Sequence, residues 1–320
     1  MVDPLPVLAV VGPTASGKTA LAVEVALRTG AEIVNADSFQ LYRGMDVGTA
    51  KPTTHQRRGV PHHLIDVLDI GDDANVADYQ RAASAVLDAI AARGRRAILV
   101  GGSGLYVRAV LEGLEIPPTD PAVRARLEQE LAAAGAAALH ARLAARDPEA
   151  AAAILATNGR RVVRALEVNE ITGGPFRATL PDRAYARPAV QVGLDVPREI
   201  LDARIAARVE RMWCDGFVDE VRALGPNRLR AGRTASRALG YAQVLRMLAG
   251  QLTEPEAKAE TIFATRRFAR RQESWFRRDQ RVVWLPFDTP ALPDRVVALA
   301  TGDADQARRP APSGRPPRLP

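Results

Sequence analysis

The chain has 320 residues, a formal net charge of +7, 47% apolar residues and a single cysteine. This length and composition suit one large domain or two smaller ones with a sizeable core, and the one cysteine excludes an intrachain disulfide. No apolar run is long enough to span a bilayer, so a soluble cytoplasmic protein is expected, and its positive charge favours an anionic partner such as nucleic acid unless it only reflects frequent use of arginine.

Strands and helices alternate through the first hundred residues. The apolar run Val7–Val11 predicts a buried strand, and Lys18–Thr29 has apolar residues at helical spacing up to Gly30. Further strands are predicted at Ala31–Ser38, within HHLIDV and within RRAILVGGSG, and a helix at Ala77–Ala92. This alternation indicates an α/β fold, a P-loop NTPase-like parallel sheet with helices on both faces.

The pattern then changes to an Ala- and Arg-rich segment without strands. Val123–Ala153 is expected to be helical throughout, with Asp120 and Asp147 as N-caps before prolines, and Arg160–Ile171 is expected to form a further helix. This composition indicates an all-helical insertion into the core. The predicted domains are a discontinuous core, residues 1–113 and 190–300, and an insertion, residues 114–189.

The sheet pattern resumes after the insertion. Ala189–Val196 and Arg281–Phe287 predict strands, and Pro293–Ala300 predicts a closing helix. The helices expected between these strands are Arg198–Met212, Val218–Leu224, Ala242–Ala249 and Glu254–Arg278. Residues 301–320 are rich in Pro and Arg and have little to bury, which predicts a disordered tail.

The octet GPTASGKT at Gly12–Thr19 matches the phosphate-binding pattern G-x-x-x-x-G-K-[ST]. It lies between a predicted strand and a predicted helix, as this motif requires. Its backbone N–H groups would surround phosphate oxygens, Lys18 would add positive charge, and Thr19 would offer a hydroxyl to Mg²⁺. The residues expected to contact phosphate are Gly12, Pro13, Thr14, Ala15, Ser16, Gly17, Lys18 and Thr19.

The motif alone leaves open whether the phosphate belongs to ATP, to GTP or to a diphosphate that is not a nucleotide. A GTPase should contain an N-K-x-D tetrapeptide, and this chain has none. An ATPase usually has an acidic residue at a strand end for Mg²⁺, but AILVGG ends in glycine, and Asp66 is the remaining candidate. Nucleotide hydrolysis is therefore poorly supported.

Two polar residues follow predicted strands. Asp37 comes after EIVNA, and Ser103 lies in VGGSGLY. Because ligands of open parallel sheets bind outside the carboxyl ends of the strands, both side chains are expected near the phosphates, where Asp37 could accept a proton. The alternatives are a capping Asp-Ser pair and a simple glycine turn.

Arginines are concentrated on two of the predicted helices. Arg208 lies on the first, and six arginines of the second surround Trp275 and Phe276. Basic side chains interleaved with aromatic ones suit an RNA backbone with stacked bases. The alternative is a solvated helix face over an aromatic core stripe.

These segments, in this order, resemble the tRNA dimethylallyltransferases, also called tRNA isopentenyltransferases. The matching segments are GPTASGKT, NADSFQLYRGMDVGTAKP, VGGSGLY, RRVVRALEV, DGFVDEVRAL and RALGY, and the similarity runs from about Val7 to about Leu285. The resemblance implies transfer of a dimethylallyl group from dimethylallyl diphosphate to N6 of the adenosine immediately 3′ of the anticodon in certain tRNAs. The phosphate compound is then a prenyl diphosphate.

The resemblance also implies roles for single residues. Gly12–Thr19 would bind the diphosphate, with Mg²⁺ as cofactor at Thr19, and Asp37 would accept the N6 proton. Lys18, Ser103 and Arg208 would act at the same centre, Ser103 replacing a common Thr and keeping its hydroxyl. The positions implied to contact tRNA are Asp37, Ser38, Phe39, Gln40, Arg124, Arg160, Arg161, Val162, Val163, Arg164, Arg237, Gly240 and Tyr241.

The implied partners are tRNA and dimethylallyl diphosphate, with no membrane and no obligate protein partner, and a monomer suffices to bind one stem-loop. The zinc-finger extension of eukaryotic members has no counterpart, which indicates a bacterial type. Two other functions stay open. A P-loop kinase for small molecules would turn over ATP, and an RNA-binding protein with an inactive P-loop would bind anticodon stems without catalysis.

Overall fold

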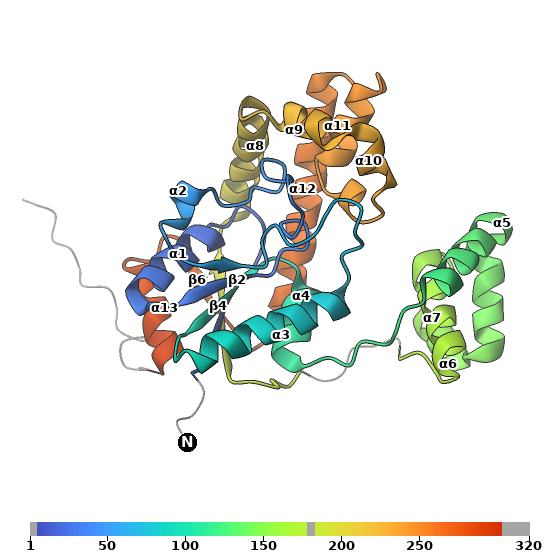
Figure 1. The fold of residues 1–320 in the computed structure, drawn as a ribbon, viewed down its shortest axis with the longest axis horizontal. Coiled ribbons are helices and arrows are strands. Elements are labelled where there is room, and N and C mark those ends of the chain that lie inside the picture. Colours follow the sequence, from blue (N-terminus) through green and yellow to red (C-terminus); the bar gives the residue numbers. More distant parts are fainter. Residues whose placement is uncertain (1–4, 178–182, 303–320) are drawn as a thin grey trace, which may run out of the picture. The chain divides into compact units, whose positions relative to one another are not determined.

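The computed structural model describes residues 5–177 and 183–302, and within them a parallel six-stranded sheet forms the centre of the fold (Figure 1). The strands lie in the order β3-β2-β4-β1-β5-β6. Their bounds are β1 Val7–Val11, β2 Glu32–Asn35, β3 His62–His63, β4 Ala97–Gly101, β5 Ala189–Asp195 and β6 Val282–Pro286. This sheet confirms the predicted P-loop NTPase-like α/β fold.

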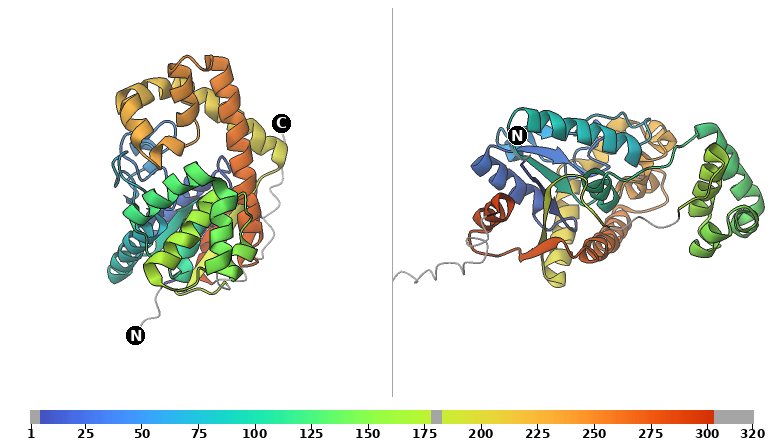
Figure 2. Two further views of the ribbon diagram at one scale, coloured as in Figure 1. Left: turned by 90° about the vertical axis from the view of Figure 1, so that its right-hand side faces the viewer. Right: turned by 90° about the horizontal axis from the view of Figure 1, so that it is seen from below.

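Helices cover both faces of this sheet, as Figures 1 and 2 show. α3 and α4 pack on one face, and α1, α8 and α13 pack on the other. The bounds are α1 Lys18–Thr29, α3 Val76–Ala92, α4 Gly104–Glu112, α8 Arg198–Cys214 and α13 Leu292–Thr301. The long helix α12, Glu254–Arg277, contributes side chains to both faces.

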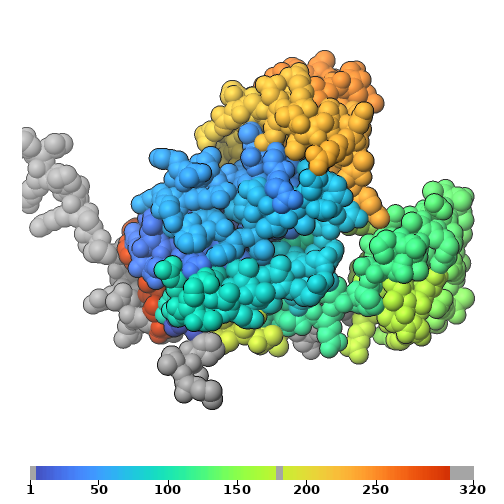
Figure 3. All heavy atoms as spheres, viewed as in Figure 1, coloured from blue at the N-terminus to red at the C-terminus, as the bar shows by residue number. Residues whose placement is uncertain are grey.

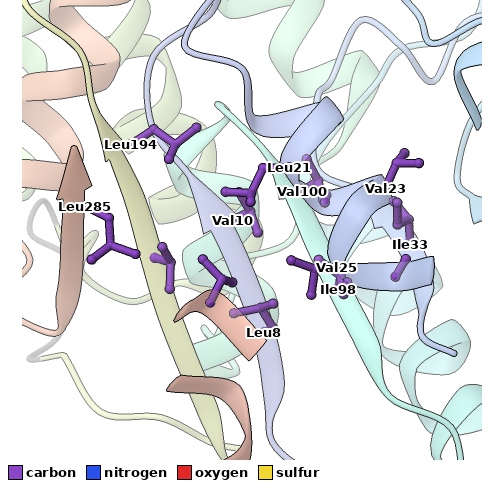
Figure 4. Close-up of a cluster of buried hydrophobic side chains, with 14 of the residues drawn as sticks. Leu8, Val10, Leu21, Val23, Val25, Ile33, Ile98, Val100, Leu194 and Leu285 are labelled. Atoms are coloured by element: carbon purple, nitrogen blue, oxygen red, sulfur yellow. The ribbon is translucent and has the colours of Figure 1, made fainter. Parts of the chain in front are cut away.

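The central strand β1 is buried on both faces because its side chains alternate between two hydrophobic clusters. Leu8 and Val10 pack with residues of α1, α8 and α13, and Figure 4 shows this cluster. Val7 and Val11 pack in the other cluster with residues of α3 and α4. The strand therefore delivers the residues after Val11 to a fixed point at the carboxyl edge of the sheet.

Four short helical elements were not predicted from the sequence. They are α2 Thr54–Arg57, α4, α10 Pro226–Ala231 and the 3₁₀ turn Ala235–Arg237. α4 begins at Gly104, the last residue of the glycine-rich segment 101–104, and these glycines favour a turn over a helix in the sequence. α10 and the 3₁₀ turn pack with α9, Phe217–Leu224, and α11, Tyr241–Leu248, in a separate hydrophobic cluster. In the space-filling view the blue loop after β2 adjoins these orange helices (Figure 3).

Two predicted strands are shorter than expected. The strand predicted at Ala31–Ser38 ends at Asn35, whose side chain bonds the backbone of the following turn. The strand predicted within HHLIDV keeps two residues, because Leu64 and Asp66 have φ angles of 59° and 60°, which no strand accommodates.

The described chain separates into two compact units. Unit 1 runs to Leu114 and resumes at Tyr185, and unit 2 is Glu115–Ala184. Unit 2 contains α5 Pro121–Arg146, α6 Pro148–Ala153 and α7 Gly159–Thr172, packed around a leucine-rich core. Asp120 and Asp147 cap α5 and α6 through backbone N–H groups, as predicted. The helical run is not continuous, because Gly135 leaves the helical conformation and kinks α5.

The predicted tail lies outside the described residues from position 303 onward. Among the helices that the structure describes, none combines the length and the apolar character that a bilayer crossing requires.

Candidate active site

The loop Gly12–Thr19 connects β1 to the first turn of α1. Gly12 and Gly17 have φ angles of 124° and 101°, and Ala15 adopts the left-handed region at 65°. Such conformations turn backbone N–H groups toward the inside of the loop. The Ser16 hydroxyl is buried there without a hydrogen-bond partner. An unpaired buried donor inside a loop of N–H groups suits an anionic ligand.

Lys18 folds back across this loop, and its Nζ donates to the Pro13 carbonyl at 2.5 Å. Burial lowers the pKa of Lys18 to about 7; the nearby Arg208 guanidinium lowers it as well, and the Asp37 carboxylate opposes both. Lys18 therefore gains or loses its proton near neutral pH, and a bound anion would favour the charged form.

Arg208 reaches the loop from α8. Its guanidinium donates to the Thr14 hydroxyl at 3.0 Å. Arg204, one turn earlier on the same face, instead stacks over the Phe287 ring at 4.5 Å from the ring centre. Of these two arginines, Arg208 is the one whose bond to Thr14 directs its charge to the loop.

Asp37 lies in a turn that the end of β2 holds in place. The Asn35 amide accepts from the Asp37 N–H at 3.0 Å and donates to the carbonyls of Asp37 and Leu64 at 3.0 and 2.9 Å. The Asp37 carboxylate accepts the Phe39 N–H at 3.0 Å. Burial raises the pKa of Asp37, an effect that this hydrogen bond and the charges of Lys18 and Arg208 partly offset. Asp37 is thus a fixed, partly desolvated carboxylate among cations.

Ser103 joins this group from the end of β4. Its hydroxyl accepts the Ser38 N–H at 3.3 Å. The surrounding glycines serve close packing, because a Cβ at Gly102 would lie 2.0 Å from the Gln272 amide and one at Gly104 would lie 2.2 Å from the Trp275 ring. The edge of the sheet therefore brings together Lys18, Asp37, Ser103 and Arg208.

The loop that follows Asp37 is held by a carboxylate that the sequence analysis missed. Glu220 of α9 accepts the N–H groups of Asp46, Val47 and Gly48 at 2.9, 2.6 and 3.2 Å. It also accepts the Tyr241 hydroxyl at 2.5 Å. DGFVDEVRAL contains this residue, but nothing in the local pattern distinguishes it from a solvated helix glutamate.

Asp66, the remaining candidate for an acidic Mg²⁺ position, is engaged elsewhere. Its carboxylate pairs with the buried amine of Lys51 at 2.5 Å, and Lys51 also pairs with Asp46. The two carboxylates neutralise a buried cation, so a structural role accounts for Asp66.

The positions implied to contact tRNA in unit 1 differ in accessibility. Ser38, Phe39 and Gln40 are half-buried beside Asp37, and Arg237 is exposed. Gly240 is buried, and Tyr241 has no exposed surface. Contacts of Tyr241 with tRNA would therefore be indirect, through the backbone that its packing positions.

In unit 2, Arg160 and Arg161 are exposed at the first turn of α7, while Val162 and Val163 are buried. The remaining two arginines meet a fully buried carboxylate: Arg124 binds Glu167 through two nitrogens, and Arg164 binds it at 2.7 Å. Arg164 also donates to the carbonyls of Pro117 and Pro118. Part of the charge of Arg124 and Arg164 is thus neutralised within the unit.

The basic helix α12 presents a groove of about 430 Å³. Its lining residues are Arg270, Arg271, Ser274, Trp275 and Arg278. Phe276 is buried in the core beneath it. Trp275 lines the groove and also packs against the core cluster that contains Phe276.

The described residues contain no cluster of three or more His, Cys, Asp and Glu side chains that could hold a metal ion. Mg²⁺ commonly binds through one or two side chains, substrate phosphate oxygens and water.

Comparison with known proteins gives consistent matches. A family model described as IPP transferase matches residues 40–279. A tRNA dimethylallyltransferase of Thermobifida fusca is 66% identical over 304 residues, covering 93% of this chain and 95% of the relative. One of Streptomyces avermitilis is 65% identical, covering 92% and 95%.

Solved structures agree. A tRNA isopentenylpyrophosphate transferase from Bacillus halodurans has a TM-score of 0.68 and 38% identity, and the match covers 94% of this chain and 96% of that one. A eukaryotic dimethylallyltransferase acting on tRNA has a TM-score of 0.76 at 22% identity, covering 96% and 81%, and shares the fold.

Proposed function

The chain belongs to the bacterial-type tRNA dimethylallyltransferase family and transfers a dimethylallyl group to tRNA, and we propose that the acceptor is N6 of the adenosine immediately 3′ of the anticodon. The donor in this proposal is dimethylallyl diphosphate. The observation that carries the proposal is the convergence of Lys18, Asp37, Ser103 and Arg208 at one edge of the sheet. It combines an anion site with a carboxylate that can take up a proton.

The proposed diphosphate site is the loop Gly12–Thr19. Its N–H groups, Lys18 and Arg208 would hold the leaving group and stabilise the negative charge that develops on it. The unpaired hydroxyl of Ser16 supports this assignment, because a phosphate oxygen would satisfy it. The Arg208–Thr14 hydrogen bond supports it as well, since it directs a cation at the loop without a neutralising carboxylate in that contact.

Mg²⁺ fits this site as a cofactor bound mainly by the diphosphate. Thr19 is exposed at the first turn of α1, where its hydroxyl would be one ligand, and diphosphate oxygens and water would supply the others. When bound, the ion would neutralise part of the diphosphate charge.

The proposed reaction is a direct alkyl transfer. The N6 lone pair forms a bond to C1 of the dimethylallyl group while the C1–O bond breaks, and diphosphate leaves with that electron pair. N6 also loses one proton, which we assign to the Asp37 carboxylate. The raised pKa of Asp37 makes it a stronger base than an exposed aspartate, and Ser103, which bonds the Asp37–Ser38 turn, would keep that turn in register.

The proposed tRNA contacts lie on both units. In unit 1 they are Asp37–Gln40, Arg237, Gly240, Tyr241 and the groove of α12, where guanidinium groups suit phosphates and Trp275 suits a stacked base. In unit 2 they are Arg124 and the segment Arg160–Arg164. The target adenine would have to leave its stack to reach the half-buried Asp37 carboxylate. One chain can bind one stem-loop, so we propose a monomer, and the tRNA substrate suits a location in the cytoplasm.

The test is transfer of label from radioactive dimethylallyl diphosphate to an unmodified tRNA transcript in the presence of Mg²⁺. Nuclease digestion should yield N6-(dimethylallyl)adenosine from the position 3′ of the anticodon. A matched transcript with guanosine at that position should take up no label. Label on the guanosine transcript, or on another nucleotide, would contradict the proposed acceptor.

A further inference from the structure

Gln272 is a buried polar residue of α12 that no proposed reaction step uses. Its side-chain oxygen accepts the Thr14 N–H at 2.8 Å, and its amide nitrogen donates to the Gly102 carbonyl at 3.0 Å. One amide therefore bridges the loop after β1 and the turn after β4. Both bonds are buried or partly buried, where an unpaired donor or acceptor is costly.

This bridge fixes Thr14 in two ways. The Thr14 N–H is bound to α12 through Gln272, and its hydroxyl is bound to α8 through Arg208. The next residue, Ala15, has a left-handed φ of 65°, a conformation that persists only where the surroundings impose it. Thr14, from which the loop bends toward Lys18, is therefore held in place by two helices.

The sequence around Gly102 is adapted to the same bridge. A Cβ at Gly102 would lie 2.0 Å from the Gln272 amide nitrogen, so any larger residue would displace that amide. On the exposed side of α12, Arg271 and Trp275 line the basic groove. Gln272 lies on the buried side of the same helix and bonds the loop after β1.

We propose that Gln272 is a positioning residue for the diphosphate loop. By pairing the Thr14 N–H, it holds the start of the loop so that the later N–H groups, Lys18 and Arg208 face one ligand. The inference rests on the proposed function of the loop as the diphosphate site. It predicts that loss of the amide weakens diphosphate binding while RNA binding by the groove persists.

The experiment compares Gln272→Leu with Gln80→Leu, measuring inorganic diphosphate with Mg²⁺ by calorimetry and a labelled anticodon stem-loop by fluorescence anisotropy. Gln80 also donates two bonds from a partly buried amide, to Ala109 and Leu114, but away from the loop. Gln272→Leu should weaken diphosphate binding about tenfold, the factor for one unpaired buried donor, and leave stem-loop affinity unchanged. Gln80→Leu should change neither.

A second variant disturbs the same hydrogen-bonded bridge at Gly102 and tests the proposal if Gln272→Leu does not fold. Gly102→Ala should displace the amide and weaken diphosphate binding similarly, and in the Gln272→Leu background it should add little. Wild-type diphosphate affinity in Gln272→Leu, or additive effects of the two changes, would overturn the inference. Failure of the wild-type protein itself to bind diphosphate would overturn the proposed function of the loop as well.

Discussion

Replacing Lys18 by Met should change how the stability of unit 1 depends on pH. In the folded protein, burial lowers the pKa of Lys18 from 10.5 to about 7. In the unfolded chain the amine keeps its ordinary pKa. Between these two values the unfolded state binds more protons than the folded state, so the free energy of unfolding rises with pH across this window.

The size of the effect follows from the width of the window. From pH 7 to pH 9 the unfolded chain keeps the Lys18 proton, whereas in the folded protein Lys18 is half protonated at pH 7 and nearly unprotonated at pH 9. The unfolded state therefore binds almost one proton more than the folded state over most of these two pH units. At about 1.4 kcal/mol per unit, the wild type should gain about 2 kcal/mol relative to Lys18→Met, in which nothing titrates at this position. Titrating groups that do not interact with Lys18 contribute equally to both proteins and cancel.

Urea titrations followed by tryptophan fluorescence measure this difference. The three tryptophans of the chain, Trp213, Trp275 and Trp284, all lie in unit 1. Lys258→Met is the matched control, because carboxylates around Lys258 raise its pKa and it stays protonated up to pH 9 in both states. If the free energies of unfolding of wild type and Lys18→Met differ by a constant amount from pH 7 to pH 9, the lowered pKa of Lys18 is refuted.

Three further substitutions test the site and unit 2. Asp37→Asn should lower single-turnover transfer by about two to four orders of magnitude with little change in tRNA affinity, and a near-wild-type rate at saturating substrates would contradict its role as base. Arg160→Ala should weaken stem-loop binding and reduce the slope of log affinity against log salt by about one, whereas an unchanged slope would argue against a phosphate contact. Glu167→Ala leaves Arg124 and Arg164 without their buried partner and should destabilise the fold by about 3 kcal/mol, measured as an earlier loss of helical circular dichroism; an unchanged melting curve would mean that water replaces the carboxylate.

The parts of the fold that could be predicted are those whose signal is local. β1, the phosphate loop and α1 follow one another directly, so Gly12–Thr19 identifies all three. The rule that ligands bind at the carboxyl ends of parallel strands predicts from the sequence that Asp37 and Ser103 lie at the same edge of the sheet. The rule works because the strand register, with β4 beside both β1 and β2, fixes those two ends as neighbours.

The supporting contacts could not be predicted in the same way. Gln272 bonds Thr14 across 258 positions, and Glu220 bonds Val47 across 173. In the sequence both look like ordinary polar helix residues, because their burial depends on which helices meet in the folded chain. The ends of β2 and β3 also involve a distant contact: Asn35, the last residue of β2, donates to the carbonyl of Leu64, the residue after β3.

The strand order has a consequence for how the chain can fold during synthesis. β1 is complete at Val11, but one of its edges pairs with β5, which starts at Ala189. At about 5 to 20 residues per second, a ribosome needs roughly 10 to 40 s to deliver the intervening chain. Throughout that time the centre of the sheet has an open hydrogen-bonding edge, the kind of surface on which chains aggregate. Unit 2 is made within this interval, so its length adds to the time for which the nascent core remains exposed.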